Sequence, residues 1–146
     1  MRSAIVLMNQ YYSFFDQTSD LGIEVMGPDL ESLYRNAALG LTDLITDLKM
    51  LKSIKSRIVN VQAEDRELLL REFLAELLYL FHIENFLARD IKIIEISGTN
   101  LKAELSGEPI KIGTHRIHRE IKSVTYHQLC IKQNESGFKA RFVLDI

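Results

Sequence analysis

The chain of 146 residues carries 18 Lys and Arg against 20 Asp and Glu, a formal net charge of -2 at pH 7, and 47% of its residues are hydrophobic. This length fits one domain with its own core, and the charge argues against bulk attraction to nucleic acid, so any link to RNA is expected to be indirect or local. The single cysteine, Cys130, excludes an internal disulfide and suits a reducing cytoplasm.

Residues 1–10 are interpreted as a lead-in to a domain over residues 11–146. The run from Met1 to Met8 is apolar with one basic residue, too short for a membrane span and a poor secretory signal. A first strand or a poorly ordered segment would explain it. We therefore expect a cytoplasmic protein that does not engage a membrane.

The first half of the chain predicts two strands, a helix, a third strand and a second helix. Alternation favours strands over Tyr11 to Asp16 and Leu21 to Met26. Apolar residues at helical spacing then indicate a helix from the N-cap Asp29 to Leu48. A strand over Lys55 to Ala63 and an amphipathic helix from Glu64 to about Phe81 follow.

The second half reads as strands separated by turns. Strands are expected over Ile91 to Ser97, Leu101 to Leu105, Ile121 to Lys132 and Phe138 to Ile146, with a turn at Gly107-Glu108-Pro109. The pattern predicts a single α+β domain in which two helices cover one face of a mostly antiparallel sheet.

The segment Asp16-Gln17-Thr18-Ser19-Asp20 places two carboxylates in one short turn, and the chain closes on Leu144-Asp145-Ile146. Asp20, Asp145 and the terminal carboxylate of Ile146 would supply oxygen ligands for a hard cation such as Ca²⁺ or Mg²⁺. The alternative, that Asp16 and Asp20 only stabilise the turn, is equally compatible with the spacing.

Lys122 is the other candidate functional residue. Strand periodicity places Glu120, Lys122, Val124 and Tyr126 on one face, so Lys122 faces either solvent or a partner. His115 and His118 lack the further ligands that structural zinc needs. No familiar catalytic or phosphate-binding motif occurs.

Several of these segments together resemble the archease family. They are Asp16 to Ile23, Leu30-Glu31 with Asn36-Ala37-Ala38, Gly107-Glu108-Pro109, Lys122 to His127 and the closing Leu144-Asp145-Ile146. Each motif is weak alone, but their order and spacing from about Tyr11 to Ile146 are specific. Gln17 departs from the family, which usually has His after the first acid.

The resemblance implies a metal-binding accessory protein of the tRNA-splicing RNA ligase, one that promotes guanylylation of the ligase by GTP without catalysing ligation itself. It carries the family's metal ligands onto Asp20, Asp145 and Ile146, with calcium the usual cation and magnesium or manganese as alternatives. The family's basic residue falls on Lys122, as a partner-binding residue.

Two other functions are compatible with the sequence. Archeases have also been described as chaperone-like modulators of RNA methyltransferases, so a tRNA methyltransferase is an alternative partner. Two acids and a cation could also activate water in a metal-dependent phosphoester hydrolase, although no obvious base accompanies them.

Overall fold

The computed structural model describes residues 11–17 and 20–146. Residues 1–10, which include the expected lead-in, and Thr18 and Ser19 of the acidic turn lie outside the described residues. The elements in chain order are β1 (Tyr12–Gln17), β2 (Asp20–Gly27), α1 (Leu30–Ile45), the 3-10 turn η1 (Leu48–Met50), β3 (Lys55–Gln62), α2 (Arg66–Glu84), β4 (Phe86–Ile96), β5 (Asn100–Pro109), β6 (Ser123–Val124), β7 (Cys130–Asn134) and β8 (Gly137–Asp145).

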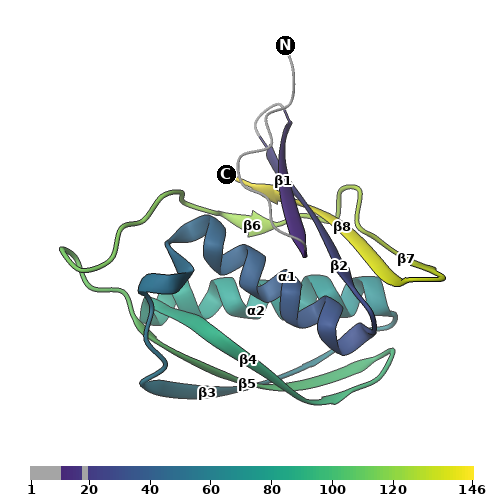
Figure 1. Ribbon diagram of the computed structural model, residues 1–146, viewed down its shortest axis with the longest axis horizontal. Helices are drawn as coiled ribbons and strands as arrows, with labels where there is room; N and C mark the ends of the chain where they lie inside the picture. Colours follow the sequence, from purple (N-terminus) through teal and green to yellow (C-terminus); the bar gives the residue numbers. More distant parts are fainter. Residues whose placement is uncertain (1–10, 18–19) are drawn as a thin grey trace.

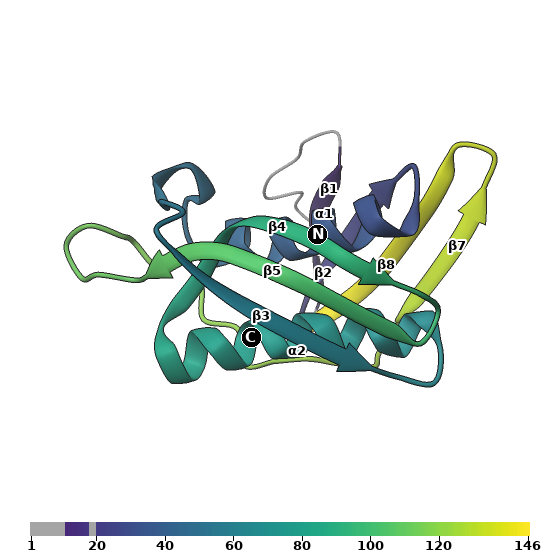
Figure 2. The same cartoon turned by 90° about the horizontal axis from the view of Figure 1, so that it is seen from below.

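The two helices lie between two antiparallel sheets (Figure 1). One sheet has the order β1-β2-β8-β6, with β7 also paired to β8, and the other, seen from below in Figure 2, has the order β3-β5-β4. The predicted α+β class and two helices are confirmed. The strands form two sheets rather than the single one expected, because apolar faces on both sides of the helix pair each need a cover.

The helices begin where the sequence places an aspartate. Asp29 accepts a hydrogen bond from the Ser32 amide at 2.7 Å, and Asp65 accepts one from the Leu68 amide at 2.8 Å, so each satisfies an otherwise free N–H. The ends differ from the predictions. α1 stops at Ile45 rather than Leu48, and α2 runs on to Glu84, where Asn85 in the left-handed conformation closes it.

The core of the five-stranded sheet comes from alternate residues of its central strands. On β2 these are Leu21, Ile23 and Val25, and on β8 they are Ala140, Phe142 and Leu144; all are fully buried on the side that faces the helices. Because strand side chains alternate, the residues between them point to the outer face of the sheet. Asp20 and Asp145 are among those.

Two expectations for the second half are wrong. Gly107-Glu108-Pro109 is not a turn but the end of β5, paired with the start of β4. The run from Ile121 to Lys132 is not one strand. Within it, only β6 and the first residues of β7 are strand, each paired with β8, and a turn separates them. None of the described helices is long and apolar enough to cross a bilayer.

A substitution at Gly107 tests how closely β5 approaches β4. A Cβ at Gly107 would overlap the carbonyl oxygen of Leu87 and crowd Ala88 Cα, whereas one at Gly98 would meet nothing within 4 Å. Backbone cannot move aside as a flexible side chain can, so we predict that Gly107→Ala lowers the free energy of unfolding by about 1–3 kcal/mol. Urea denaturation measures this; Gly98→Ala is the control, and equal stability of the two variants would show that the strands are not in close contact here.

Candidate metal centre

Asp20 and Asp145 are cross-strand partners. β2 and β8 are antiparallel in a continuous register from Gly27 opposite Phe138 to Asp20 opposite Asp145. Directly opposed residues of an antiparallel pair have Cβ atoms about 4.5–5.5 Å apart, and like charges in this position repel. Two acids 125 positions apart in the chain therefore meet at one end of the sheet.

Neither carboxylate is neutralised by a neighbour within the described residues. Their strand neighbours Leu21 and Leu144 are fully buried, so Asp20 and Asp145 point to the outer face, where both are half-buried. In the part of the chain that the structure describes, neither side chain forms a hydrogen bond or ion pair. A cation bound between the two carboxylates would relieve their mutual repulsion.

The short strand β6 lies on the other side of β8 and completes the site. Ser123 pairs with Asp145, so its hydroxyl falls in the same row as the two acids. The Lys122 amide donates a hydrogen bond to the Asp145 carbonyl at 2.7 Å. Ile146 follows directly, with its side chain half-buried against the core. Sequence periodicity missed Ser123, because nothing in the sequence reveals that β6 pairs with the last strand.

Lys122 is exposed, and its ammonium has no partner among the described residues. The periodicity that placed it on one face with Val124 is wrong, since Val124 is buried while Lys122 and Tyr126 are exposed. The reason is that β6 has two residues only and the chain leaves the sheet on either side of it. The backbone of Lys122 therefore lies beside that of Asp145, while the Lys122 side chain extends into solvent.

The donor set suits a hard cation. Oxygen ligands from carboxylates are what Ca²⁺ and Mg²⁺ take, and the two aspartates with the Ile146 carboxylate are all of this kind. Over residues 11–17 and 20–146 no three His, Cys, Asp or Glu side chains are placed to hold a metal. Asp20 and Asp145 would therefore be two of the ligands of a cation, and the Ile146 carboxylate is the third that the sequence analysis expects. Asp16 pairs with Leu21, one position away from the acidic pair.

The two histidines considered for zinc, His115 and His118, instead form hydrogen bonds that hold the β5–β6 connection (residues 110–122) in place. His115 accepts a hydrogen bond at Nδ1 from the Lys111 amide (2.9 Å), so Nε2 carries the proton and donates to Glu108 Oε2 (3.0 Å). His118 lies 2.9 Å from Asp47. The two imidazoles have different partners, Glu108 and Asp47.

The same connection is fastened to both helices. The Thr46 hydroxyl donates to the Arg116 carbonyl (2.6 Å) and the His118 amide to the Ile45 carbonyl (2.7 Å), both at the end of α1. At the end of α2, His82 Nε2 donates to the Ile121 carbonyl (2.9 Å). These bonds fix the backbone that leads into Lys122.

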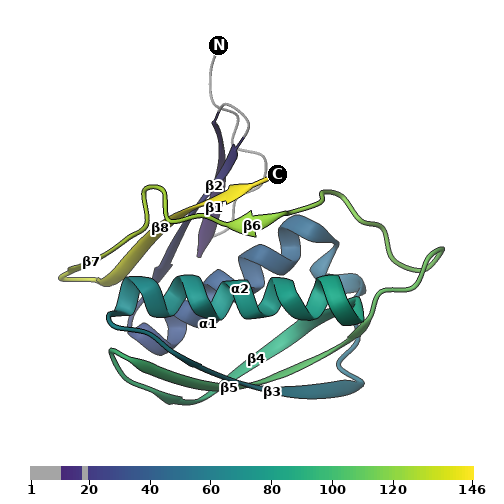
Figure 3. The ribbon, with the colours of Figure 1, turned by 180° about the vertical axis from the view of Figure 1, so that it is seen from behind.

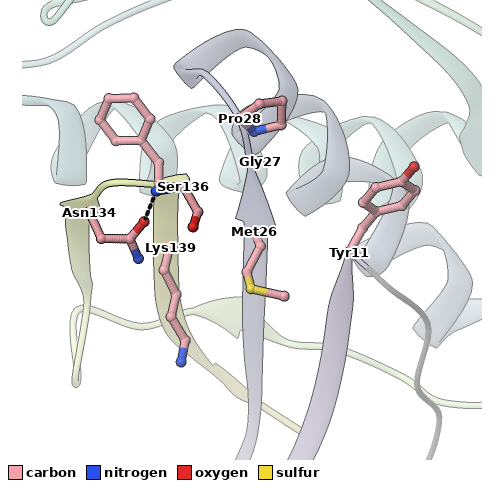
Figure 4. Close-up of a pocket in the computed structure, with 8 residues that line it drawn as sticks. Tyr11, Met26, Gly27, Pro28, Asn134, Ser136 and Lys139 are labelled. Atoms are coloured by element: carbon pink, nitrogen blue, oxygen red, sulfur yellow. Dashed lines mark hydrogen bonds between the residues drawn. The ribbon is translucent and has the colours of Figure 1, made fainter.

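Two hollows flank the sheet. The larger, of about 580 Å³, lies between the end of α2 and the β5–β6 connection and is lined by Phe81, His82, Asn85, Ile117, Glu120, Ile121 and Lys122. The other, of about 220 Å³, lies at the far end of β2 from Asp20 (Figure 4). There Met26 and Lys139 point into a shallow, mostly apolar space beside the β7–β8 turn, in which the Ser136 amide donates to Asn134. Only the larger hollow adjoins the candidate site.

The fold and the acidic strand ends define a small α+β protein with two helices between antiparallel sheets and a candidate oxygen-ligand cation site. The model of the archease protein family matches residues 12–146. The archease of Methanothermobacter thermautotrophicus is 36% identical over 138 residues, 92% of this chain and 98% of that protein. The archease of Thermococcus kodakarensis is 35% identical over 139 residues, with the same coverage of 92% and 98%. The chain belongs to the archease family.

Solved structures agree. The solution structure of a Methanobacterium thermoautotrophicum protein has a TM-score of 0.80 at 36% identity, covering 92% of this chain and 98% of that one. The crystal structure of an archease from Thermotoga maritima, described as a possible chaperone, has a TM-score of 0.62 and covers 89% and 93%. At 19% identity this second likeness concerns the fold alone.

The ionisation of Glu108 makes the stability of the folded protein depend on pH. Burial raises the pKa of Glu108, but hydrogen bonds from the Lys52 amide and His115 and the charge of Lys111 outweigh it, and the pKa is lowered from 4.5. A lowered folded-state pKa contributes stability that is fully present above about pH 4.5 and lost as the pH falls through the folded pKa.

We predict that Glu108→Gln lowers the free energy of unfolding by about 1 kcal/mol at pH 7, because a charge-assisted hydrogen bond is weakened. The difference from the native protein should shrink below about pH 4.5. Urea denaturation between pH 7 and pH 3 measures it, with Glu120→Gln, an exposed acid without a described partner, as control. A pH-independent difference would mean that the charge of Glu108 contributes nothing.

Proposed function

We propose that this protein is a metal-binding, non-enzymatic activator of the tRNA-splicing RNA ligase, which it helps to react with GTP and to turn over repeatedly. The observation that carries the proposal is the pairing of Asp20 with Asp145 at an outer strand end, where neither acid has a partner among the described residues. A pair of like charges is costly to keep. Membership of the archease family supports the same function.

Asp20, Asp145 and the α-carboxylate of Ile146 would hold one divalent cation, with calcium favoured and magnesium or manganese as alternatives. When bound, the ion supplies positive charge that offsets the negative charge developing on nucleotide phosphates of the ligase. The role of these residues is to position that charge, which is why the continuous β2–β8 register matters.

Lys122 has a separate role in this proposal. Its amide is fixed to the Asp145 carbonyl while its ammonium reaches into solvent. A flexible ammonium at this point can contact a phosphate or an acidic residue of the ligase. RNA itself would be met only through the ligase, since the net charge of -2 gives no general attraction to a polyanion.

The experiment is multiple-turnover RNA joining by the ligase of the same organism, with GTP and divalent metal, with and without substoichiometric amounts of this protein. Acceleration supports the activator. No effect, with the ligase shown to be active in a single turnover, favours the chaperone-like alternative, which predicts a stable complex with a tRNA methyltransferase. GTP or phosphoester hydrolysis by this protein alone would favour the hydrolase.

We predict that Asp145→Asn reduces the activation at least tenfold, because it removes one charged ligand from the site. Stability should be unchanged or slightly higher, since the substitution also removes the repulsion from Asp20. Initial rates of RNA joining and urea denaturation provide the two measurements. Glu135→Gln, an exposed acid in the β7–β8 turn, is the control; full activation by Asp145→Asn would refute the metal site.

A further inference from the structure

One side of α2 is uncovered and carries two large apolar side chains among polar ones. At 100° per residue, Arg71, Glu72, Tyr79, His82 and Ile83 fall within one arc of about 120°, while the buried leucines and Phe73 lie on the rest of the circumference. Figure 3 shows α2 from a side on which neither sheet lies in front of the helix. Tyr79 is 57% exposed and Ile83 65%.

A second exposed tyrosine, Tyr126, extends this surface toward β6. Arg71 donates from Nε to the Val124 carbonyl (3.0 Å), and its guanidinium lies 4.4 Å from the centre of the Tyr126 ring. Tyr126 is held there by a cation–π contact although it is 62% exposed. Tyr126, Tyr79 and Ile83 therefore present apolar surface to solvent on a rigid support.

The hollow of about 580 Å³ opens at the end of the same helix side. His82, one turn after Tyr79, closes one wall through its hydrogen bond to the Ile121 carbonyl, and Phe81 and Ile117 supply apolar lining. The wall is fixed before anything binds. A preformed apolar hollow with a few polar groups at its edge is the usual form of a binding pocket.

This surface is continuous with the proposed metal centre through Lys122. The Lys122 backbone is bonded to Asp145, and the same residue lines the hollow. A stable protein–protein interface covers roughly 800 Å² on each partner, so a protein that reaches Asp20 and Asp145 must also cover neighbouring surface. The exposed side of α2 is the neighbouring surface that contains a hollow with apolar lining.

We infer that the α2 surface, formed by Tyr79, Ile83, Tyr126 and the adjoining hollow, is where the RNA ligase docks. The inference rests on the proposed function and adds the contact surface to it. The ligase inserts an aromatic or branched apolar side chain into the hollow, beside an acidic residue that pairs with Lys122. Glu120 in the lining would repel phosphate, which disfavours RNA as the occupant.

The test is the affinity of the full-length protein for the ligase, by surface plasmon resonance, with the variants Ile83→Asp and Tyr79→Asp. Both side chains are mostly exposed, so the variants should fold, and far-ultraviolet circular dichroism checks this. Each should bind at least tenfold more weakly, the effect of losing an interface hot spot. The control is Ile58→Asp, an apolar residue 55% exposed on the opposite sheet, which should bind as the native protein does.

The outcomes separate the two proposals. Native-like binding of both α2 variants to a ligase that the protein still activates would overturn the docking surface and leave the activator function in place. A native protein that neither binds nor activates the ligase overturns both. A concentration-dependent dimer abolished by Ile83→Asp, or RNA binding lost in the same variant, would assign the surface to a second copy or to RNA and overturn the inference. Asp145→Asn, which leaves the α2 surface intact, should lose activation to a much larger extent than it loses ligase binding.

Discussion

The candidate site depends on the antiparallel pairing of β2 with β8, because this pairing alone sets Asp20 opposite Asp145. Register in a sheet is fixed by which residues are buried. Leu21, Ile23 and Val25 on one strand and Ala140, Phe142 and Leu144 on the other are all fully buried against the helices. A slip of either strand by one residue would turn its three buried side chains to the outer face and separate the acids. The core that stabilises the fold therefore also positions the carboxylates.

The second determinant of the site is the connection between the two sheets. Residues 110–122 leave β5, cross the ends of both helices and enter β6 beside β8. A connection of this length would be mobile if it were free, but Glu108 with His115, Thr46 with Arg116, and His82 with Ile121 hold it at three points. The place of Lys122 therefore follows from contacts made far from it in the chain, and the same contacts form the hollow beside α2.

Much of this arrangement is predictable from local sequence. Helix starts at Asp29 and Asp65 follow from capping, and the strands on either side of the acidic turn follow from alternation. The acids Asp20 and Asp145 could be selected by their chemistry and by resemblance to the archease family. The structure pairs these two residues, whereas the metal-ligand roles of Asp20, Asp145 and Ile146 and the partner role of Lys122 stay predictions.

What could not be predicted depends on contacts between distant segments. Gly107 in a Gly-Glu-Pro run suggests a turn, and only the approach of Leu87 shows why a strand needs glycine there. Ser123 enters the site because a strand of two residues pairs with the last one, a signal too short for periodicity. Two sheets rather than one follow from the apolar faces on both sides of the helix pair, which a count of strands does not reveal.

Calorimetric titration of Ca²⁺ into the isolated protein tests the central assignment most directly, with Asp20→Asn as the variant. We predict one site in the native protein and at least tenfold weaker binding in Asp20→Asn, because each aspartate supplies a charged oxygen ligand. Absence of binding of Ca²⁺, Mg²⁺ or Mn²⁺ to the native protein, or equal affinity in the variant, would contradict the assignment of Asp20 and Asp145 as a metal centre.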